Sequence, residues 1–416
     1  MNAQAFLDLY EDGKQSLPGA VQARDLAAAL LRTSGLPTRR MEQWKYTDLR
    51  LLTALTLGDA PDTVDAAMLL DNLGLAEAGL ADTSRLVFVN GRFESSLSRL
   101  DEGLDIEIGV SMGPLARPER DGMVALNTML TKDGARIHVG PGIDAGRVLL
   151  VCLGRNDAEP AVLTQPRFAV LLEEGARLSL LEIAHGDGLY VNNPVLEIEL
   201  RARAHLAHVL LQDEGARALH FSTVYTSVDT AASYDSFTLA LGARLARHEV
   251  HARLAGRGGT VHVNGAQLLG DRQHADLTSV IAHDAPGCIS RQTVKNVLSG
   301  HARGVFQGKI VVDRIAQKTD GYQMNQALLL SETAEIDSKP ELEIYADDVK
   351  CSHGATAGAL DEEQLFYLRS RGVPADTARA ILVRAFLDDA LALIEDAPVR
   401  ALLDAALDRS WSGSTP

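Results

Sequence analysis

The sequence predicts a mainly β protein with helical segments at both ends. From about residue 137 to 345, short runs such as "RFAVLLEEG" and "VLEIELRA" alternate in polarity and are separated by Gly, Asp and Asn turns. Before and after this stretch, apolar residues recur at helical spacing. We therefore divide the chain into a mainly helical region, residues 1–135, a β core, residues 136–350, and a C-terminal helical domain, residues 351–416.

The N-terminal region combines helices with one hairpin. In "VQARDLAAALLRTSGLP", Leu26, Leu30 and Leu31 fall at helical spacing, and glycine and proline follow as stop signals. Farther along, Asn90-Gly91 stands between two extended runs. This dipeptide predicts a type I′ hairpin turn.

The central region contains no helix-length periodic segment, which disfavours an alternating βαβ sheet. A faint repeat links "GARLSLLE" at 175, "RAHLAHVL" at 203 and "GARLARHE" at 242. Stacked β-coils would explain such a repeat, since each coil buries its inward residues against its neighbours. A β-sandwich is the alternative, and the pattern by itself does not separate the two.

Helical periodicity returns after "HGAT". Asp361, with Gln364 three residues later, resembles a capping box that opens "EEQLFYLRSRG". A Gly-Val-Pro break follows, and "DTARAILVRAFLDDALALIED" and "VRALLDAALDRSW" then predict two more helices. "KCSHGAT" at 350–356 therefore stands at the junction between the strands and the C-terminal helices.

Composition narrows the class of protein. The 416 residues carry a formal charge of −16, which disfavours sequence-independent binding to nucleic acid or to anionic membranes. No apolar run approaches the roughly 20 residues of a membrane span. The first residues have neither a basic nor an apolar signal region, and the three cysteines are odd in number and far apart. We expect a cytoplasmic protein without a disulfide framework.

Motifs of nucleotide and metal chemistry are incomplete. "RGVFQGKI" has Arg303 where a phosphate loop begins with glycine, and Ile310 where it needs Ser or Thr. "GRGGTV" lacks the third glycine of a dinucleotide fingerprint. In "HEVH", strand alternation puts His248 and His251 on opposite faces, whereas a zincin needs HExxH on a helix.

Two other patterns have structural interpretations. Trp44 and Tyr46 in "EQWKYTDL" are expected to anchor the N-terminal helices on the core. In "HADLTSVIAHD", His274, Asp276 and Thr278 share one strand face and predict a polar ladder along a solenoid.

"KCSHGAT" carries the strongest candidate for chemistry. Strand alternation puts Asp347, Val349, Cys351 and His353 on one face. Thiolate and imidazole together suit zinc or iron, but a closed zinc site needs about four ligands. This segment supplies two strong ligands, with Asp347 as a third candidate, so it fits a half-site that another subunit completes. The competing interpretation is a buried structural cysteine beside a hydrogen-bonded histidine.

Two more histidines lie near strand ends. They are His283 in "IAHDAPGCIS" and His301 in "LSGHARG", and sequence alone does not place either beside Cys351.

These segments resemble a known family. The stretch from "HARGVFQGKIVVDRIAQKTDGYQMNQ" through "KPELEIYADDVKCSHGAT", together with "EQWKYTDL" and "HDAPGCISRQTVKNVLSG", is similar to the SufB/SufD family of iron–sulfur cluster assembly scaffolds. The likeness is densest between about 280 and 372. Gly354 stands where the SufB branch has glutamate, so the chain is similar to the SufD branch.

The resemblance implies a right-handed parallel β-helix flanked by helical domains. It also implies a heterodimer with a SufB-like paralogue through the end of the β-helix, and a SufC-like ABC ATPase bound to the C-terminal helices. A homodimer of the chain alone is a separate possibility, and the sequence does not decide between it and the heterocomplex. No resident cofactor is implied: ATP belongs to the partner, and iron or an iron–sulfur cluster forms transiently near Cys351 and His353. We assign the ATPase contact to residues of the predicted helices: Asp361, Leu365, Phe366, Tyr367, Arg371 and Phe386.

The leading hypothesis is thus a non-catalytic scaffold subunit of an ATP-driven assembly complex. One alternative is a β-helix enzyme acting on polysaccharide, which would need clustered carboxylates or basic residues along the solenoid. The other is a thiol enzyme that uses Cys351 with His353, for which a rapid alkylation burst near neutral pH is expected.

Overall fold

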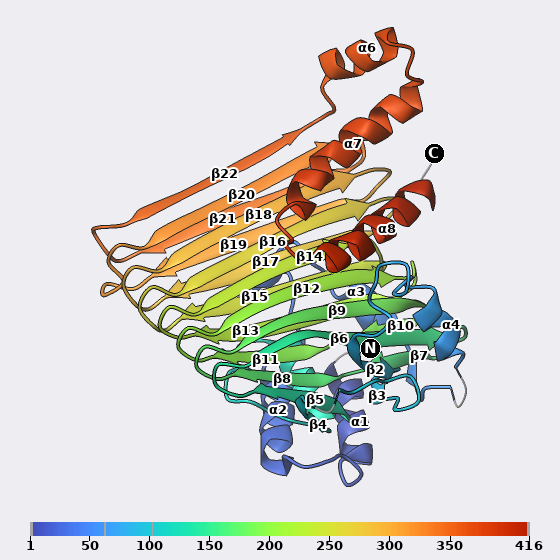
Figure 1. Ribbon diagram of the computed structural model, residues 1–416. Helices are drawn as coiled ribbons and strands as arrows, with labels where there is room; N and C mark the ends of the chain where they lie inside the picture. The colour runs from blue at the N-terminus through green and yellow to red at the C-terminus, as the bar shows by residue number, and fades with distance from the viewer. Residues whose placement is uncertain (1–2, 62–63, 102, 414–416) are drawn as a thin grey trace.

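The protein is a parallel β-solenoid of about eight turns with helices at both ends, seen in a computed structural model that describes residues 3–61, 64–101 and 103–413 (Figure 1). Each coil gives one strand to each of two sheets, and strands two apart along the chain pair in parallel. The predicted mainly β core with flanking helices is confirmed. The sandwich alternative is wrong, because these parallel pairs place successive coils on top of one another.

One sheet has ten strands, and β22, from the last coil, lies at the opposite end of the sheet from β6 (Figure 1). In spatial order its strands are β22 (Lys350–Gly358), β20 (Asp320–Leu329), β18 (Ile289–Leu298), β16 (Thr260–Leu269), β14 (Ser233–Ala240), β12 (His205–Glu214), β9 (Arg177–Gly188), β6 (Asp144–Asn156), β2 (Ser84–Val89) and β3 (Arg92–Phe93).

The second sheet has twelve strands. Its main path runs β21 (Glu335–Ile344), β19 (Arg303–Val312), β17 (His274–His283), β15 (Leu245–Leu254), β13 (Leu219–Val228), β11 (Val195–Leu200), β8 (Arg167–Leu172), β5 (Gly134–Val139) and β4 (Asp105–Ile108). Three short strands pair beside this path: β1 (Leu57–Gly58), β7 (Ala161–Thr164) and β10 (Tyr190–Asn192).

The space between the sheets is filled by alternate residues of each strand. Leu180 on β9, Val224 on β13 and Val263 on β16 belong to this core, and each is 1% exposed. Burying these apolar side chains is what holds the coils together, because a single coil has no core of its own.

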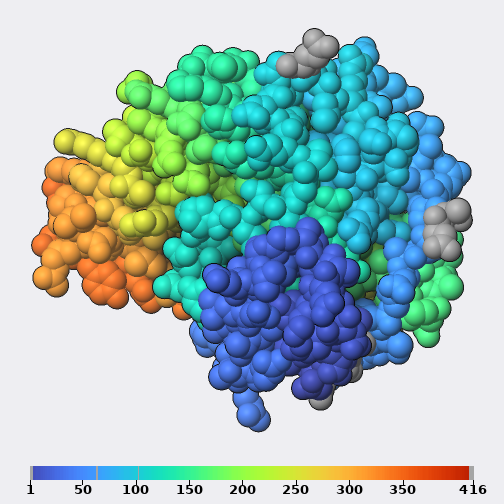
Figure 2. All heavy atoms as spheres, turned by 90° about the horizontal axis from the view of Figure 1, so that it is seen from below, coloured from blue at the N-terminus to red at the C-terminus, as the bar shows by residue number. Residues whose placement is uncertain are grey.

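Helices cover the outer faces of both sheets. Their bounds are α1 (Ala3–Gly13), α2 (Val21–Ser34), the 3₁₀ turn η1 (Glu42–Trp44), α3 (Arg50–Ala54), α4 (Ala66–Asp71), α5 (Gly122–Leu130), α6 (Glu362–Ser370), α7 (Ala375–Leu391) and α8 (Ala397–Gly413). Helices α1, α2 and α5 share a core with β13 and β15, and Figure 2 shows the N-terminal segment as a lobe beside the solenoid. Helices α7 and α8 lie on the ten-stranded sheet (Figure 1).

The hairpin prediction is confirmed. Val89 of β2 pairs with Arg92 of β3, which leaves Asn90 and Gly91 as a two-residue turn. Both turn residues have positive φ, 45° and 76°, as a type I′ turn requires.

The faint repeat is confirmed in part. Its first two copies lie on β9 and β12, which are neighbours in one sheet, with Leu178 opposite Leu206. The third copy lies on β15 in the other sheet, so it is not a further layer of the same stack.

The segment "EQWKYT" docks the N-terminal lobe on the twelve-stranded sheet, as the aromatic pattern predicts. Trp44 is 4% exposed, and its indole Nε1 donates to Oδ2 of Asp121 at 3.3 Å. The guanidinium of Arg247 lies 4.3 Å from the centre of the Trp44 ring. Tyr46 is only half-buried, so the anchor is Trp44.

The predicted polar ladder on β17 also contributes to this docking. Thr278 donates to Asp276 at 2.7 Å, and Thr47 of the N-terminal lobe donates to the same carboxylate at 2.5 Å. Oγ1 of Thr47 also lies 3.0 Å from Nε2 of His274. The ladder is therefore a structural contact.

The buried His248 and His283, together with the half-buried His274, predict a fold that loses stability in acid. Burial lowers the pKa of His248 to about 3 and the pKa values of His274 and His283 to about 4. An unfolded histidine titrates near 6.5. Between roughly pH 6.5 and 4 the unfolded chain binds more protons, so each group lowers the free energy of unfolding by up to about 1.4 kcal/mol per pH unit as the pH falls.

The measurement is urea unfolding at several pH values between 7 and 4.5. His274→Gln should flatten the pH slope by about 1.4 kcal/mol per unit, because one linked proton is lost. His301→Gln, which changes an exposed histidine, serves as the matched control and should leave the slope unchanged. An unaltered slope in His274→Gln would contradict the prediction.

Candidate functional site at the open end of the solenoid

The last coil leaves the solenoid open. Within the described part of the chain, β21 pairs only with β19, and β22 only with β20. Ile344, near the end of β21, is 40% exposed, and most of β22 is exposed as well. This end therefore presents two free strand edges and the interior between them.

Cys351 and His353 lie together on β22 and face this open interior. Their register partners on β20 are Gly321 and Gln323. Cys351 is half-buried against the apolar cluster of Ile310, whereas His353 is exposed. No hydrogen bond joins thiol and imidazole among the described residues, so the two side chains are neighbours without being a bonded dyad.

Asp347 does not join them, and the prediction of a shared strand face is wrong for it. The residue lies in the bend between β21 and β22, and β22 begins only at Lys350. Alternation cannot be extended through a bend. Across residues 3–61, 64–101 and 103–413, no group of three or more His, Cys, Asp and Glu side chains is arranged to hold a metal ion.

His283, on β17, lies two coils behind Cys351, whereas His301 is exposed in the turn before β19. Ser290, Gly321 and Cys351 occupy the same position on three successive strands. Nε2 of His283 lies 2.9 Å from Oγ of Ser290. Since Gly321 has no side chain, a Cβ placed there would lie 3.5 Å from both that hydroxyl and the Cys351 sulfur.

Buried amides form the layer behind His353. Gln292, Gln323 and His353 stack at one position of β18, β20 and β22, and both glutamines are fully buried. Ser279 donates to Oε1 of Gln292 at 2.5 Å. Sequence reasoning missed this row, although its signal is glutamine recurring at equivalent positions of consecutive coils.

The environment of Cys351 predicts a thiol that reacts slowly with alkylating reagents at neutral pH. Burial raises the pKa of Cys351, with a smaller contribution from Asp320, so the thiol is protonated at neutral pH. We expect iodoacetamide to alkylate Cys351 in the isolated chain more slowly at pH 7 than it alkylates free cysteine, and faster as the pH rises.

Mass spectrometry of the labelled chain measures this rate, since Cys152 and Cys288 are buried and distinguishable by peptide. His353→Ala should leave the rate within about twofold, because the imidazole makes no bond to the thiol. A stoichiometric burst near neutral pH that disappears in His353→Ala would instead support the thiol-enzyme alternative.

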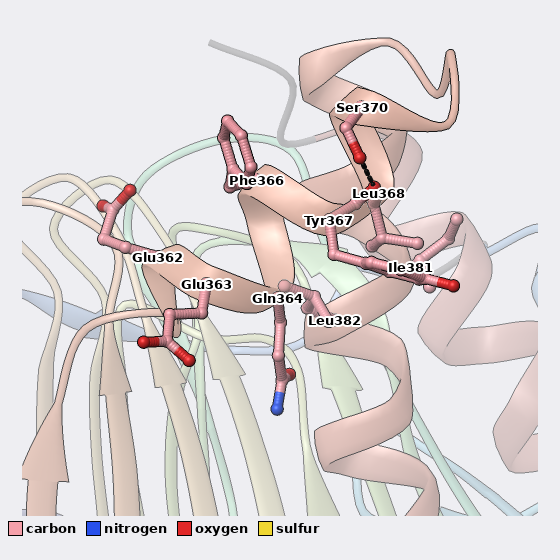
Figure 3. Close-up of a pocket in the computed structure, with 9 residues that line it drawn as sticks. All are labelled: Glu362, Glu363, Gln364, Phe366, Tyr367, Leu368, Ser370, Ile381 and Leu382. Atoms are coloured by element: carbon pink, nitrogen blue, oxygen red, sulfur yellow. Dashed lines mark hydrogen bonds between the residues drawn. The ribbon is translucent and has the colours of Figure 1, made fainter.

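A second surface feature lies on the C-terminal helices. A groove between α6 and α7 is lined by Glu362, Glu363, Gln364, Phe366, Tyr367, Leu368, Ser370, Ile381 and Leu382 (Figure 3). Phe366 and Tyr367 are 74% and 58% exposed, and none of the residues of α6 is buried. Solvent-exposed aromatic side chains of this kind mark contact surfaces.

Of the residues predicted to contact a partner, five lie on α6 or directly at its ends, and Phe386 lies on α7. Asp361 caps α6, accepting from the backbone N–H groups of Glu363 and Gln364. Leu365 is half-buried on α6, and Arg371 stacks its guanidinium 5.2 Å from the Tyr367 ring.

Phe386 lies elsewhere. It packs α7 on the solenoid, with Nζ of Lys295 lying 4.5 Å from the centre of its ring. The same lysine is 2.8 Å from Oδ2 of Asp389. Phe386 therefore fixes the helix that carries the groove and is not part of the groove lining.

Comparison with known proteins shows the family of the chain. Residues 154–386 match the family model described as "SUF system FeS cluster assembly, SufBD core domain". The chain is 33% identical to the iron–sulfur cluster assembly protein SufD of Escherichia coli over 94% of this chain and 93% of the relative. It is 32% identical to a SufBD family protein of Synechocystis (89% and 86%) and 30% identical to the chloroplastic protein ABCI7 of Arabidopsis thaliana (92% and 84%).

The protein is thus a β-solenoid of the iron–sulfur cluster assembly class. The chain belongs to the SufBD family, and the similarity to SufD supports a role in iron–sulfur cluster assembly by the SUF system. Among the described residues, no helix is long and apolar enough to cross a membrane.

Proposed function

We propose that this chain is a non-catalytic scaffold subunit of the SUF machinery, which pairs with a SufB-like paralogue through its open end and binds a SufC-like ATPase through the groove of α6 and α7. The observation that carries the proposal is the uncapped last coil, which presents Cys351 and His353 between two free strand edges. A free edge with complementary geometry is a template for pairing with another chain.

The free edges of β21 and β22 differ in how strongly they resist pairing with another strand. On β21, Pro340 is flanked by Lys339 and Glu341, and charges recur along the strand. Proline and charged side chains discourage edge pairing. Strand β22 reads "KCSHGATAG", with Lys350 as its one formal charge and small residues after Gly354. The paralogue is therefore expected to pair along β22, and in its absence a second copy of this chain takes the same place.

The open end supplies part of a ligand set. Cys351 and His353 offer sulfur and nitrogen, which suit iron and iron–sulfur clusters. Four ligands close such a site, so the paralogue would contribute the rest. The iron or cluster is cargo that passes through the interface. Because the pKa of the free thiol is raised, capture of iron by Cys351 would release a proton.

The groove suits an ATPase surface with apolar and basic side chains. Phe366, Tyr367 and Ile381 provide exposed apolar area, and Glu362 and Glu363 give the rim negative charge. ATP would be bound by that partner.

The three cysteines are free, as expected in the reducing cytoplasm where we place the complex.

Helix α6 offers a mechanical link between the two surfaces. It follows β22 after residues 359–361, and none of its residues is buried (Figure 1). Helix α7, by contrast, is tied to α8, because the guanidinium of Arg384 on α7 pairs with Asp404 and lies 2.5 Å from Asp408, both on α8. Movement of α6 by a dimerising ATPase would therefore act on β22 and reshape the Cys351 site. If locking the ATPase in its ATP state leaves the labelling rate of Cys351 in the complex unchanged, this coupling is absent.

The assembly is tested by light scattering on an anaerobic size-exclusion column after co-expression with SufB-like and SufC-like partners. The expected particle holds one copy of this chain, one paralogue and two ATPase subunits. If the chain elutes alone beside well-folded partners, the scaffold proposal fails.

A variant tests the ATPase contact separately. Phe366→Ala should raise the dissociation constant for the ATPase by at least about 30-fold, which corresponds to a hot-spot loss of about 2 kcal/mol. Binding to the paralogue should be unaffected. Ile143→Ala removes a comparably exposed apolar side chain from the turn before β6 and should change neither. Equal affinities for the two variants, measured by calorimetry, would place the ATPase elsewhere.

A further inference from the structure

A small cavity lies inside the solenoid, remote from the open end. It is bordered by Ala240, Ala246 and Ala275, whose side chains are short, and by larger polar residues of neighbouring strands. Ala246 and Ala275 are register partners on β15 and β17, and Ala240 pairs with Gln267 across β14 and β16. Alanine at consecutive levels leaves space between the sheets that side chains do not fill.

Three polar groups end at this cavity without a hydrogen-bond partner in the described chain: Nε2 of His220, Nε2 of His248 and Oε1 of Gln267. His220 and Gln267 are 1% exposed, and His248 is 6% exposed. The other nitrogen of each imidazole lies close to a polar side chain. Nδ1 of His220 lies 2.7 Å from Oε2 of Glu214, and Nδ1 of His248 lies 2.6 Å from Oγ of Ser222.

Such groups are costly to bury unless something completes their hydrogen bonds. The cavity offers about 10 Å³ to the centre of a water molecule, which is the size that one water needs. We propose that a single structural water binds here, accepting from Nε2 of His220, donating to Oε1 of Gln267 and bridging to Nε2 of His248.

The hydrogen-bond donors and acceptors around the cavity favour water over an ion as its occupant. Burial lowers the pKa of His220, but the charge and the hydrogen bond of Glu214, with a smaller contribution from Glu182, raise it overall. This favours the imidazolium form, whose Nε2–H donates to the cavity. Oε1 of Gln267 can only accept. An anion would find this carbonyl oxygen opposed to it, and a cation would meet the His220 proton. Water satisfies both, and it can either donate to or accept from His248, whose pKa burial lowers to about 3.

A crystal structure of the full chain near 1.5 Å, from crystals grown in bromide, tests the proposal directly. The expected result is one water oxygen within hydrogen-bond distance of His220, His248 and Gln267, with no anomalous signal. An empty cavity overturns the proposal. A bromide peak at the position overturns it too, because the occupant would then be an anion.

Oxygen-17 magnetic relaxation dispersion gives an independent count of long-lived internal waters in solution. His248→Phe keeps a planar ring but removes one partner and fills part of the cavity, so the variant should lose one such water relative to wild type. Gln22→Leu, an exposed change, should lose none. Circular dichroism confirms that both variants are folded. The same count in His248→Phe and wild type would contradict the assignment.

Discussion

Replacing Arg247 by leucine is expected to lower the free energy of unfolding by about 3–5 kcal/mol, the cost of breaking a buried ion pair by removing one partner. The Arg247 side chain is 2% exposed and pairs with Asp276 and with Glu249, the latter at 2.7 Å. Its guanidinium also lies over Trp44. Leucine would leave two carboxylates buried without their cation and remove the contact that holds the N-terminal lobe. Urea unfolding at pH 7 measures the change.

The matched control lies on the same strand. Arg253 is 64% exposed, and Nε lies 2.5 Å from Oδ2 of Asp284. Solvent screens such a pair, so Arg253→Leu should cost less than about 1 kcal/mol. Comparable losses in the two variants would show that the buried network contributes no more than a surface ion pair, and the proposed docking role of Arg247 would be wrong.

Ala355→Arg is expected to abolish pairing with the SufB-like paralogue while leaving the isolated chain folded. Ala355 lies on β22 opposite Asn325 and is exposed at the open end. An arginine there is tolerated in water but would become a desolvated, unpaired charge inside a strand-to-strand interface. Affinity should fall by at least two orders of magnitude, or about 3 kcal/mol, as measured by anaerobic calorimetry or light scattering.

The comparison variant is Ala60→Arg, the same chemical change at an exposed position of the N-terminal region. It should pair as well as wild type. ATPase binding to the groove of α6 and α7 should persist in both variants. If Ala355→Arg retains the paralogue at wild-type affinity, the open end of the solenoid is not the pairing surface.

Local sequence patterns were sufficient to predict much of the fold. The period-two stretch from about 137 to 345 corresponds to the solenoid, and Asn90-Gly91 forms the predicted turn. Asp361 caps α6 where the capping pattern placed it. Each of these features depends on residues close in sequence, whose backbone preferences and polarity act within a few positions.

Asp347 is a residue for which prediction from local strand alternation fails. Alternation across "DDVKCSH" assumes a continuous strand, but the coil bends before Lys350, so the aspartate leaves the shared face. The position of a bend depends on how the chain closes each coil against the one before it. That closure involves partners about thirty residues away, which a local pattern does not contain.

The sequence by itself determined the division into helical and strand regions, the common face of Cys351 and His353, and the resemblance to the SufBD family. The tertiary structure alone decided that Gln292, Gln323 and His353 form one row and that Arg247 lies against Trp44. It also decided that no further strand of the described residues pairs with the last coil. The physical reason is register. Side chains meet inside a solenoid only when successive coils stack at a fixed offset, and that offset is set cooperatively by all the coils together.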